Sequence, residues 1–155
     1  MPESDRAALA TASLVLSDRL QMDLRETQGL AYSIGASLAT LGEDRGLLSV
    51  AMGTAPDNVE KAEAEIRRVA SELRAGPIES DEIQRVVAAR VGRILMRRLP
   101  TQNQAMYDGL QLFYGRPTGG NLEFLEAIST VTPEQVADAA KRYIDPDRWV
   151  VAIIR

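Results

Sequence analysis

The residues best suited to chemistry are an arginine and a tyrosine on either side of one predicted corner of the chain. Arg25 ends a helical stripe of leucines, Gly29 interrupts the pattern, and Tyr32 enters a stretch that alternates like a strand. A guanidinium offers a fork of N–H donors and a phenol adds one O–H donor. Such a pair suits a peptide carbonyl or a developing oxyanion. Spacing alone favours a simpler interpretation, in which Arg25 complements a helix C-terminus and Tyr32 is a half-buried strand residue.

Two charged series elsewhere are weaker candidates. The basic series comprises Arg85, Arg90, Arg93, Arg97 and Arg98, and the acidic series comprises Glu60, Glu63 and Glu65. The arginines at 90, 93 and 97 are spaced to share one helix face, which an anionic partner would require. No aromatic residues interleave with them, so a solvated face is favoured. The acidic series has oxygen ligands for a hard cation but lacks the loop spacing of a calcium site. We therefore expect it to be the surface of a helix.

Composition excludes several kinds of active site. The 155 residues include no histidine and no cysteine. Zinc sites need imidazole or thiolate ligands, and the Ser-His-Asp and Cys-His nucleophiles need a base or thiol that is missing here. We therefore expect no metal site, no cofactor and no catalytic site of these kinds in this chain. Acid–base chemistry by two carboxylates stays open, but no pair of them stands out. The 18 basic and 22 acidic residues give a net charge of −4, which argues against nucleic acid as a partner. No apolar run approaches the ~20 residues of a membrane span.

Hydrophobic periodicity predicts the elements that position the Arg/Tyr pair. A stripe with three- and four-residue spacing predicts a helix over 6–26, and alternation predicts strands over 30–38 and 47–52. A turn rich in glycine and acids at 42–46 favours an antiparallel hairpin. The apolar run at 149–154 predicts a last strand. The expected fold class is α+β, with a small, mainly antiparallel sheet of about three strands covered by about five helices.

Signals for helix boundaries follow the hairpin. Gly53-Thr-Ala-Pro56 precedes a helical stripe that Gly76-Pro77 ends. Thr132-Pro-Glu-Gln135 has the pattern of a capping box, with threonine at the cap, proline at the first helical position and glutamine three residues after the cap. We therefore expect a helix from this box to about Tyr143.

These motifs, in this order, resemble the insulinase/pitrilysin family of zinc peptidases. The motifs that carry the resemblance are Ser17-Asp-Arg-Leu20, Leu24-Arg-Glu26, Gly29-Leu-Ala-Tyr-Ser33, Gly53-Thr-Ala-Pro-Asp-Asn-Val59, Ile78-Glu-Ser-Asp-Glu-Ile83, Thr132-Pro-Glu-Gln-Val136 and Asp145-Pro-Asp147. The resemblance covers residues 5–154, and the stretch 17–33 is its most specific part. It implies a metallopeptidase-type domain over nearly the whole chain.

The resemblance also implies that two homologous domains face each other across a chamber and have different roles. One domain holds zinc on an inverted His-x-x-Glu-His motif. The opposing, metal-free domain supplies an arginine and a tyrosine that contact the substrate backbone, and Arg25 and Tyr32 match these two. We therefore expect a non-catalytic, substrate-contacting domain of a zinc metalloendopeptidase, inactive alone. Its partners would be a peptide substrate and a zinc-bearing domain on the same or a separate polypeptide.

The same resemblance predicts how the chain is organised. Residues 1–155 should form a single domain, the truncated C-terminal domain of a larger peptidase, because the strands that normally precede the family's first helix are missing. A sheet without them has an unpaired edge, so we expect the chain to form a homodimer or to cover the edge with its own terminus. Two alternatives stay open. One is a degenerate homologue with a structural or assembly role, and the other is an unrelated peptide- or nucleic-acid-binding module that uses the arginine series.

Overall fold

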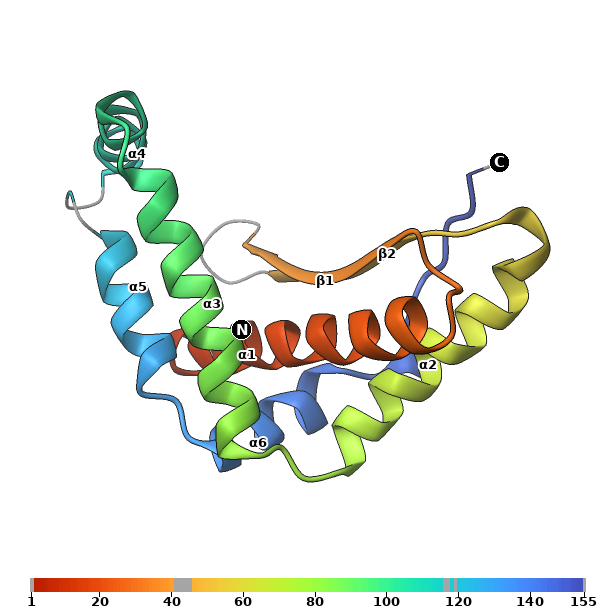
Figure 1. The fold of residues 1–155 in the computed structure, drawn as a ribbon. Helices are drawn as coiled ribbons and strands as arrows, with labels where there is room; N and C mark the ends of the chain where they lie inside the picture. The colour runs from red at the N-terminus through yellow and green to blue at the C-terminus, as the bar shows by residue number, and fades with distance from the viewer. Residues whose placement is uncertain (1, 41–45, 116–117, 119, 155) are drawn as a thin grey trace.

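The structure, a computed structural model, describes residues 2–40, 46–115, 118 and 120–154. The described residues form six α-helices and one antiparallel two-stranded sheet, in agreement with the predicted α+β class (Figure 1). The helices are α1 (Glu3–Leu20), α2 (Val59–Ala75), α3 (Ser80–Arg98), α4 (Thr101–Phe113), α5 (Gly120–Ser129) and α6 (Pro133–Tyr143). The strands are β1 (Ser33–Thr40) and β2 (Gly46–Gly53). Three short helical segments complete the order: η1 (Gln21–Thr27), η2 (Pro56–Asn58) and η3 (Pro146–Arg148).

Helix α1 is the central element, with the hairpin against one side and α6 against another (Figure 1). Its buried side chains lie on more than one side of the helix, because the hairpin and several other helices pack around it. Leu16 and Leu20 are fully buried. Each such side chain contributes roughly 1.5–3 kcal/mol by leaving water. Other elements complete the core with Leu24, Leu73, Val136, Ile128 and Ile144.

The predicted hairpin is confirmed. Strands β1 and β2 pair in an antiparallel register that runs from Ser33 opposite Gly53 to Thr40 opposite Gly46. The predicted turn lies, apart from Gly46, outside the described residues. Alternation places Ile34, Ala36, Leu38, Leu48, Val50 and Met52 on the face that packs against the core. Gly35 permits close approach to α1, because a Cβ there would lie 3.3 Å from the Ser17 hydroxyl oxygen.

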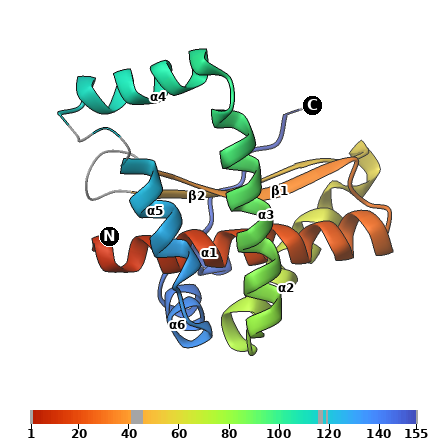
Figure 2. The ribbon, with the colours of Figure 1, turned by 60° about the vertical axis from the view of Figure 1, so that its left-hand side comes forward.

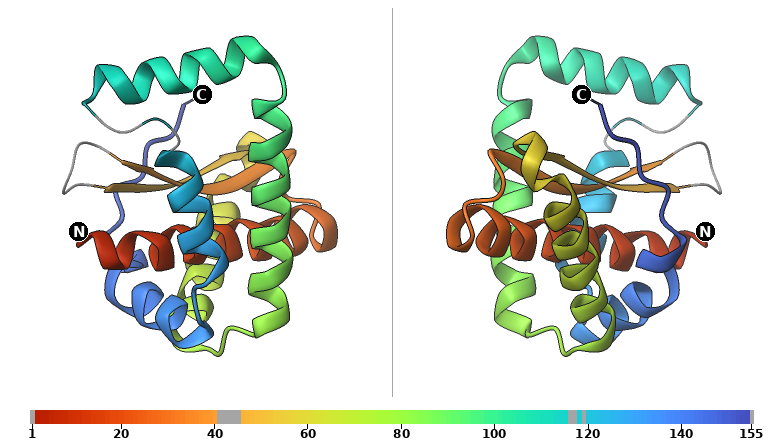
Figure 3. Two further views of the ribbon diagram at one scale, coloured as in Figure 1. Left: turned by 90° about the vertical axis from the view of Figure 1, so that its left-hand side faces the viewer. Right: turned by 90° about the vertical axis from the view of Figure 1, so that its right-hand side faces the viewer.

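Helix α3 crosses α1, and α4 extends from its far end (Figures 2 and 3). Two ion pairs hold the crossing. Arg19 donates from Nε and Nη2 to the two carboxylate oxygens of Glu82 at 2.8 Å each, and Arg85 forms a similar fork with Asp18 at 2.8 and 2.9 Å. Helix α4 has no buried residue. Among the described helices, none combines the length and the apolar character that crossing a membrane would require.

The predicted capping box is confirmed at the start of α6. The Thr132 hydroxyl accepts the Gln135 N–H at 3.4 Å, and the Gln135 side-chain oxygen accepts the Thr132 N–H at 2.9 Å. Two backbone donors that the helix itself leaves unpaired are therefore satisfied. This is the clearest case in the chain of a helix start that local sequence determines.

The predicted last strand is wrong. Residues 149–154 have no regular secondary structure, and the sheet of the described residues has two strands rather than three. The segment and β2 border a common hollow of about 620 Å³, and no backbone hydrogen bond joins the two among the described residues. Val150 and Ile154 are each 97% exposed. An apolar sequence of strand character forms a strand only beside a neighbour within hydrogen-bond reach, and the hollow keeps β2 out of that reach.

Candidate functional site

The Arg/Tyr pair lies at the corner where the first helix gives way to the hairpin. The predicted continuous helix over 6–26 is in fact α1 followed by a π-helix, η1, over Gln21–Thr27. Such wide turns are rare and are found disproportionately at functional sites. Gly29 then reverses the chain with φ +63°, a left-handed conformation that glycine adopts without a Cβ penalty.

Backbone hydrogen bonds close this corner. The Leu24 carbonyl accepts the N–H of Leu30 at 2.8 Å and that of Ala31 at 3.2 Å. The Leu24 side chain is also fully buried. Packing in the core and backbone hydrogen bonds therefore both hold Leu24 in place. Arg25 and Tyr32 each directly follow a member of the bonded Leu24–Ala31 pair. Their backbones therefore meet at one place although six residues separate them in sequence.

The strand side of the corner is held equally well. The Tyr32 N–H donates to the Gly53 carbonyl at 2.9 Å, which extends the hairpin by one bond beyond β1. The Thr54 hydroxyl donates to the Leu30 carbonyl at 2.7 Å. The backbone around Tyr32 is thus bonded to the last residue of β2 and to the residue that follows it.

Both side chains of the pair are presented to solvent. Tyr32 is 92% exposed and precedes β1, which begins at Ser33, so its interpretation as a half-buried strand residue is wrong. It borders an open hollow together with Thr54. The Arg25 side chain is 54% exposed, and its Nε lies 3.5 Å from a carboxylate oxygen of Glu26. Arg25 lies outside the lining of that hollow.

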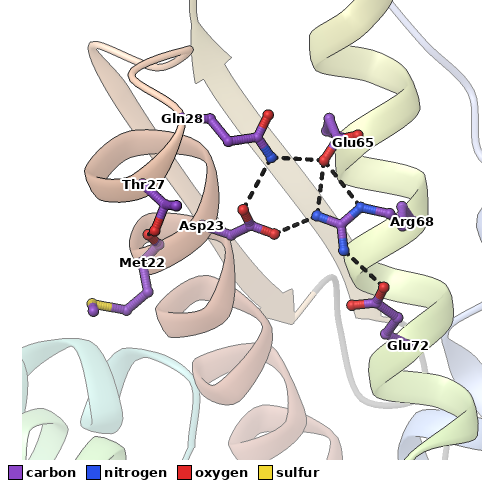
Figure 4. A network of polar contacts seen from close by, with 7 residues as sticks. All are labelled: Met22, Asp23, Thr27, Gln28, Glu65, Arg68 and Glu72. Atoms are coloured by element: carbon purple, nitrogen blue, oxygen red, sulfur yellow. Dashed lines mark hydrogen bonds and ion pairs between the residues drawn. The ribbon is translucent and has the colours of Figure 1, made fainter.

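A polar network ties the corner to α2 (Figure 4). Arg68 pairs with Asp23 of η1 and with Glu65 and Glu72 of its own helix, the last two at 2.8 and 2.7 Å. The side-chain amide of Gln28 donates to Asp23 at 3.0 Å and to Glu65 at 2.8 Å. One guanidinium and one amide thereby join the end of the first helix to the helix that follows the hairpin.

The network shifts the ionisation of its members. Hydrogen bonds from Gln28 and Arg68 lower the pKa of the Asp23 carboxyl, and hydrogen bonds from Arg68 and Gln28 lower the pKa of Glu65. The carboxylates of Glu65, Glu72 and Asp23 raise the pKa of Arg68. A carboxyl whose pKa falls on folding stabilises the fold above its unfolded pKa, about 3.9 for Asp and 4.3 for Glu. That stabilisation is lost as the pH falls through the lower, folded-state pKa.

We expect Arg68→Met to lower the melting temperature at about pH 7 and to have a smaller effect at acid pH, once the pH has fallen through the lowered pKa values of the carboxyls and they are protonated. The neutral-pH loss should be about 1 kcal/mol, the scale of a partly exposed ion-pair network. Thermal unfolding followed by circular dichroism at both pH values measures the difference. Arg74→Met, on the exposed side of the same helix, is the matched control. An Arg68→Met effect that is equal at the two pH values would contradict a role for these ion pairs.

The chain does not provide the ligands of a zinc site. It has no histidine or cysteine, and the described residues contain no group of three or more His, Cys, Asp or Glu that could hold a metal ion. In the acidic series, Glu63 and Glu65 pair with Arg67 and Arg68 of the same helix. The chemistry that the corner offers is hydrogen-bond donation.

The structure divides the arginine series. Arg85 pairs with Asp18, and the Arg98 guanidinium lies 5.9 Å from the centre of the Tyr107 ring. Arg90 and Arg97 line a hollow beside β1, whereas Arg93 is exposed and lies outside that lining. Of the three arginines that were predicted to share one face of α3, only Arg90 and Arg97 therefore line the same hollow.

Comparison with known proteins identifies the family. Residues 2–90, more than half of the chain, match the family described as the peptidase M16 inactive domain. The uncharacterized zinc protease YmxG of Bacillus subtilis (strain 168) is 26% identical over 140 residues, which are 90% of this chain and 34% of that protein. The crystal structure of a peptidase M16 inactive domain from Pseudomonas fluorescens has a TM-score of 0.76 at 20% identity, covering 93% of this chain and 35% of that one. A protease from Helicobacter pylori has a TM-score of 0.75 at 18% identity, covering 92% and 35%.

These matches bear on the chain at different levels. The structural likenesses concern the fold, because the sequence identities are low. The chain spans about a third of the length of these relatives. The family match includes α1, the hairpin and the corner that carries Arg25 and Tyr32. The resemblance to the insulinase/pitrilysin zinc peptidases is thus confirmed, and the chain belongs to the family of peptidase M16 inactive domains.

Proposed function

We propose that this chain is the substrate-contacting, metal-free domain of a zinc metallopeptidase. In this proposal a homologous zinc-bearing domain, on the same or another polypeptide, completes the enzyme. Membership of the inactive-domain family and the lack of zinc ligands in the sequence support this division. The zinc protease relative also extends far beyond the part that this chain covers, 34% of its length. Arg25 and Tyr32 are the residues that we propose to contact the peptide.

The observation that carries the proposal is the presentation of two exposed donors by a rigid corner. Backbone hydrogen bonds, the buried Leu24 and the Arg68 network hold the corner in place, while the phenol and the guanidinium remain accessible. The Arg25–Glu26 pair is exposed, and such pairs are worth only about 0–1 kcal/mol. The Arg25 guanidinium can therefore exchange Glu26 for a ligand at little cost.

The chemistry that follows is donation to a peptide carbonyl oxygen. A guanidinium N–H and a phenolic O–H bind this oxygen in the substrate. They bind it more strongly as it gains negative charge, because charge-assisted hydrogen bonds are the stronger ones. Donors that are already oriented need no reorganisation when the charge develops. The pair would thus both position the substrate and favour the tetrahedral transition state.

The test is the turnover of a fluorogenic peptide by the complete peptidase, this domain together with its zinc-bearing domain, carrying Arg25→Ala. We expect kcat to fall about 100-fold, as when one oxyanion donor is removed, with the bound zinc unchanged. Arg93→Ala removes an exposed arginine from α3 and should leave turnover unaltered. Unchanged turnover in Arg25→Ala, or a loss that follows loss of zinc, would refute the role. A wild-type protein without peptidase activity would favour the structural or assembly alternative.

We also propose that the chain self-associates through the unpaired edge of its hairpin. In the two-stranded sheet of the described residues, β2 has no ladder partner on the side away from β1. The same molecule carries the apolar segment 149–154, also without ladder bonds. Neither β2 nor this segment contains a charged residue, and charges and prolines are what usually protect an edge. Two copies can therefore pair a segment of one with the edge of the other reciprocally, which closes a dimer.

Light scattering coupled to size-exclusion chromatography should show twice the mass of one chain. Val150→Lys and Ile154→Lys should each shift the mass toward one chain, because a lysine opposes edge pairing. Both positions are 97% exposed, so neither substitution removes packing within one copy. Phe113→Lys, which replaces an 80% exposed residue of α4, is the control. A monomeric wild-type protein would refute self-association.

A further inference from the structure

A second site is suggested by the hollow that Arg90 and Arg97 line. It has a volume of about 370 Å³ and is lined by residues of α1, β1, α3, α4 and α5. Arg6 of α1 joins the two arginines of α3, which lie seven residues, or two turns, apart on the same face. The apolar part of the lining includes Leu14, Leu38, Ile94 and Ile128. No aspartate or glutamate is among the described residues that line it.

The three guanidinium groups differ from those of five other arginines of the chain. Arg19, Arg67, Arg68, Arg85 and Arg142 each have a carboxylate oxygen within 3 Å. No such ion pair involves Arg6, Arg90 or Arg97 within the part of the chain that the structure describes. Arg6 instead lies 5.5 Å from the centre of the Phe124 ring, which also borders the hollow. Three like charges thus converge without neutralisation, although the chain as a whole has a charge of −4.

A fourth arginine, Arg98, contacts a residue that lines the hollow. Arg98 stacks on Tyr107, a lining residue, at 5.9 Å from the ring centre. Its Nη1 is buried and has no hydrogen-bond partner among the described residues. Asp108 is 3.7 Å from Arg98 Nη2, beyond hydrogen-bond distance. Arg98 is thus ion-paired with Asp108 and contacts the Tyr107 ring, and the unpaired positive charge of the hollow comes from Arg6, Arg90 and Arg97.

We propose that this hollow binds a short acidic peptide, through a carboxylate side chain and a neighbouring aliphatic side chain. Guanidinium forks match a carboxylate with two parallel hydrogen bonds. The leucine and isoleucine side chains would cover the aliphatic neighbour, whereas they offer nothing to a hydrated phosphate. The volume is at the lower end for ligand sites and suits two or three side chains. A long polyanion would be repelled by the net negative charge of the protein. A short peptide is small enough that the positive potential of the three arginines dominates its binding.

This site goes beyond the proposed peptidase role and does not depend on it. Calorimetric titration of the full chain with an acetylated, amidated peptide of alternating leucine and glutamate tests it directly. We expect saturable binding, and Arg90→Gln and Arg97→Gln should each weaken it about tenfold, the loss of one charge-assisted hydrogen bond. Arg93→Gln, from the same helix but outside the lining, should change affinity less than about twofold. Equal melting temperatures confirm that each variant is folded.

Further arms of the experiment separate the carboxylate peptide from other ligands. The matched peptide with glutamine in place of glutamate should bind at least about tenfold more weakly, because it lacks the charge. Equal binding of the two peptides, or equal affinity of Arg90→Gln and wild type, would overturn the proposal. Inorganic phosphate that displaces the peptide at constant ionic strength would also overturn it, in favour of a general anion site. Tighter, Arg97-dependent binding of oligothymidylate would overturn it in favour of nucleic acid.

Discussion

The double variant Arg25→Ala/Tyr32→Phe is expected to lose about 1,000-fold in kcat/KM, well short of the product of the two single losses of about 100-fold each. Two donors to one carbonyl oxygen act as a unit, so removing the second matters less once the first has gone. A tenfold shortfall corresponds to a coupling energy of about 1.4 kcal/mol, within the range for groups in contact with a common partner. The structure places both residues at the Leu24–Ala31 junction, which makes a common target geometrically reasonable.

The measurement is kcat/KM for the wild type, the two single variants and the double variant of the complete peptidase. Tyr32→Phe removes one hydroxyl from a side chain that is 92% exposed, so folding should be preserved. A control cycle with Arg93→Ala and Tyr114→Phe, both exposed positions, should show neither single losses nor coupling. Losses that multiply fully would show that Arg25 and Tyr32 act on different groups. No loss in Tyr32→Phe would exclude the phenol from the site.

The hairpin and the corner were predictable because local patterns determine them. Alternation over 30–38 and 47–52 needs only the strand repeat, and the glycine at 29 signals the reversal before β1. Residue types and spacing singled out Arg25 and Tyr32, and the family motifs then favoured a functional role for the pair. The π-helix was missed because seven residues of wider turn cannot be told from an α-helix by apolar spacing. The prediction that Tyr32 is a half-buried strand residue was wrong because β1 begins at Ser33, three residues later than the predicted start at 30.

Long-range partners explain the remaining differences. Arg68 and Asp23 are 45 residues apart, and nothing in the sequence around either indicates that they meet. The same holds for Arg6 and Arg97, which come together because α1 and α3 border one hollow. The prediction of a last strand was wrong for the converse reason. Residues 149–154 have the composition of a strand, but composition does not supply a neighbour, and pairing depends on which chain lies within reach.

Leu24→Ala is expected to lower the free energy of unfolding by about 2–5 kcal/mol and to reduce turnover as well. Its side chain is fully buried, so truncation removes apolar contacts and leaves a cavity. Leu16→Ala, the same truncation at a fully buried position of α1, should cost a similar amount of stability. The two positions differ in their relation to the corner. Leu24 belongs to it, and its carbonyl accepts the hydrogen bonds that hold it, whereas Leu16 lies within α1.

This matched pair separates stability from positioning. Unfolding in denaturant gives the stability of each variant, and kcat is measured at a temperature where both are folded. If the corner positions Arg25 and Tyr32, Leu24→Ala should lose at least about tenfold in kcat, since misplacement by about 1 Å can cost 10²-fold. Leu16→Ala should retain kcat close to that of the wild type. Equal kcat in the two variants would mean that the corner tolerates a loss of packing, and the pair would then owe its placement to the backbone hydrogen bonds and the Arg68 network alone.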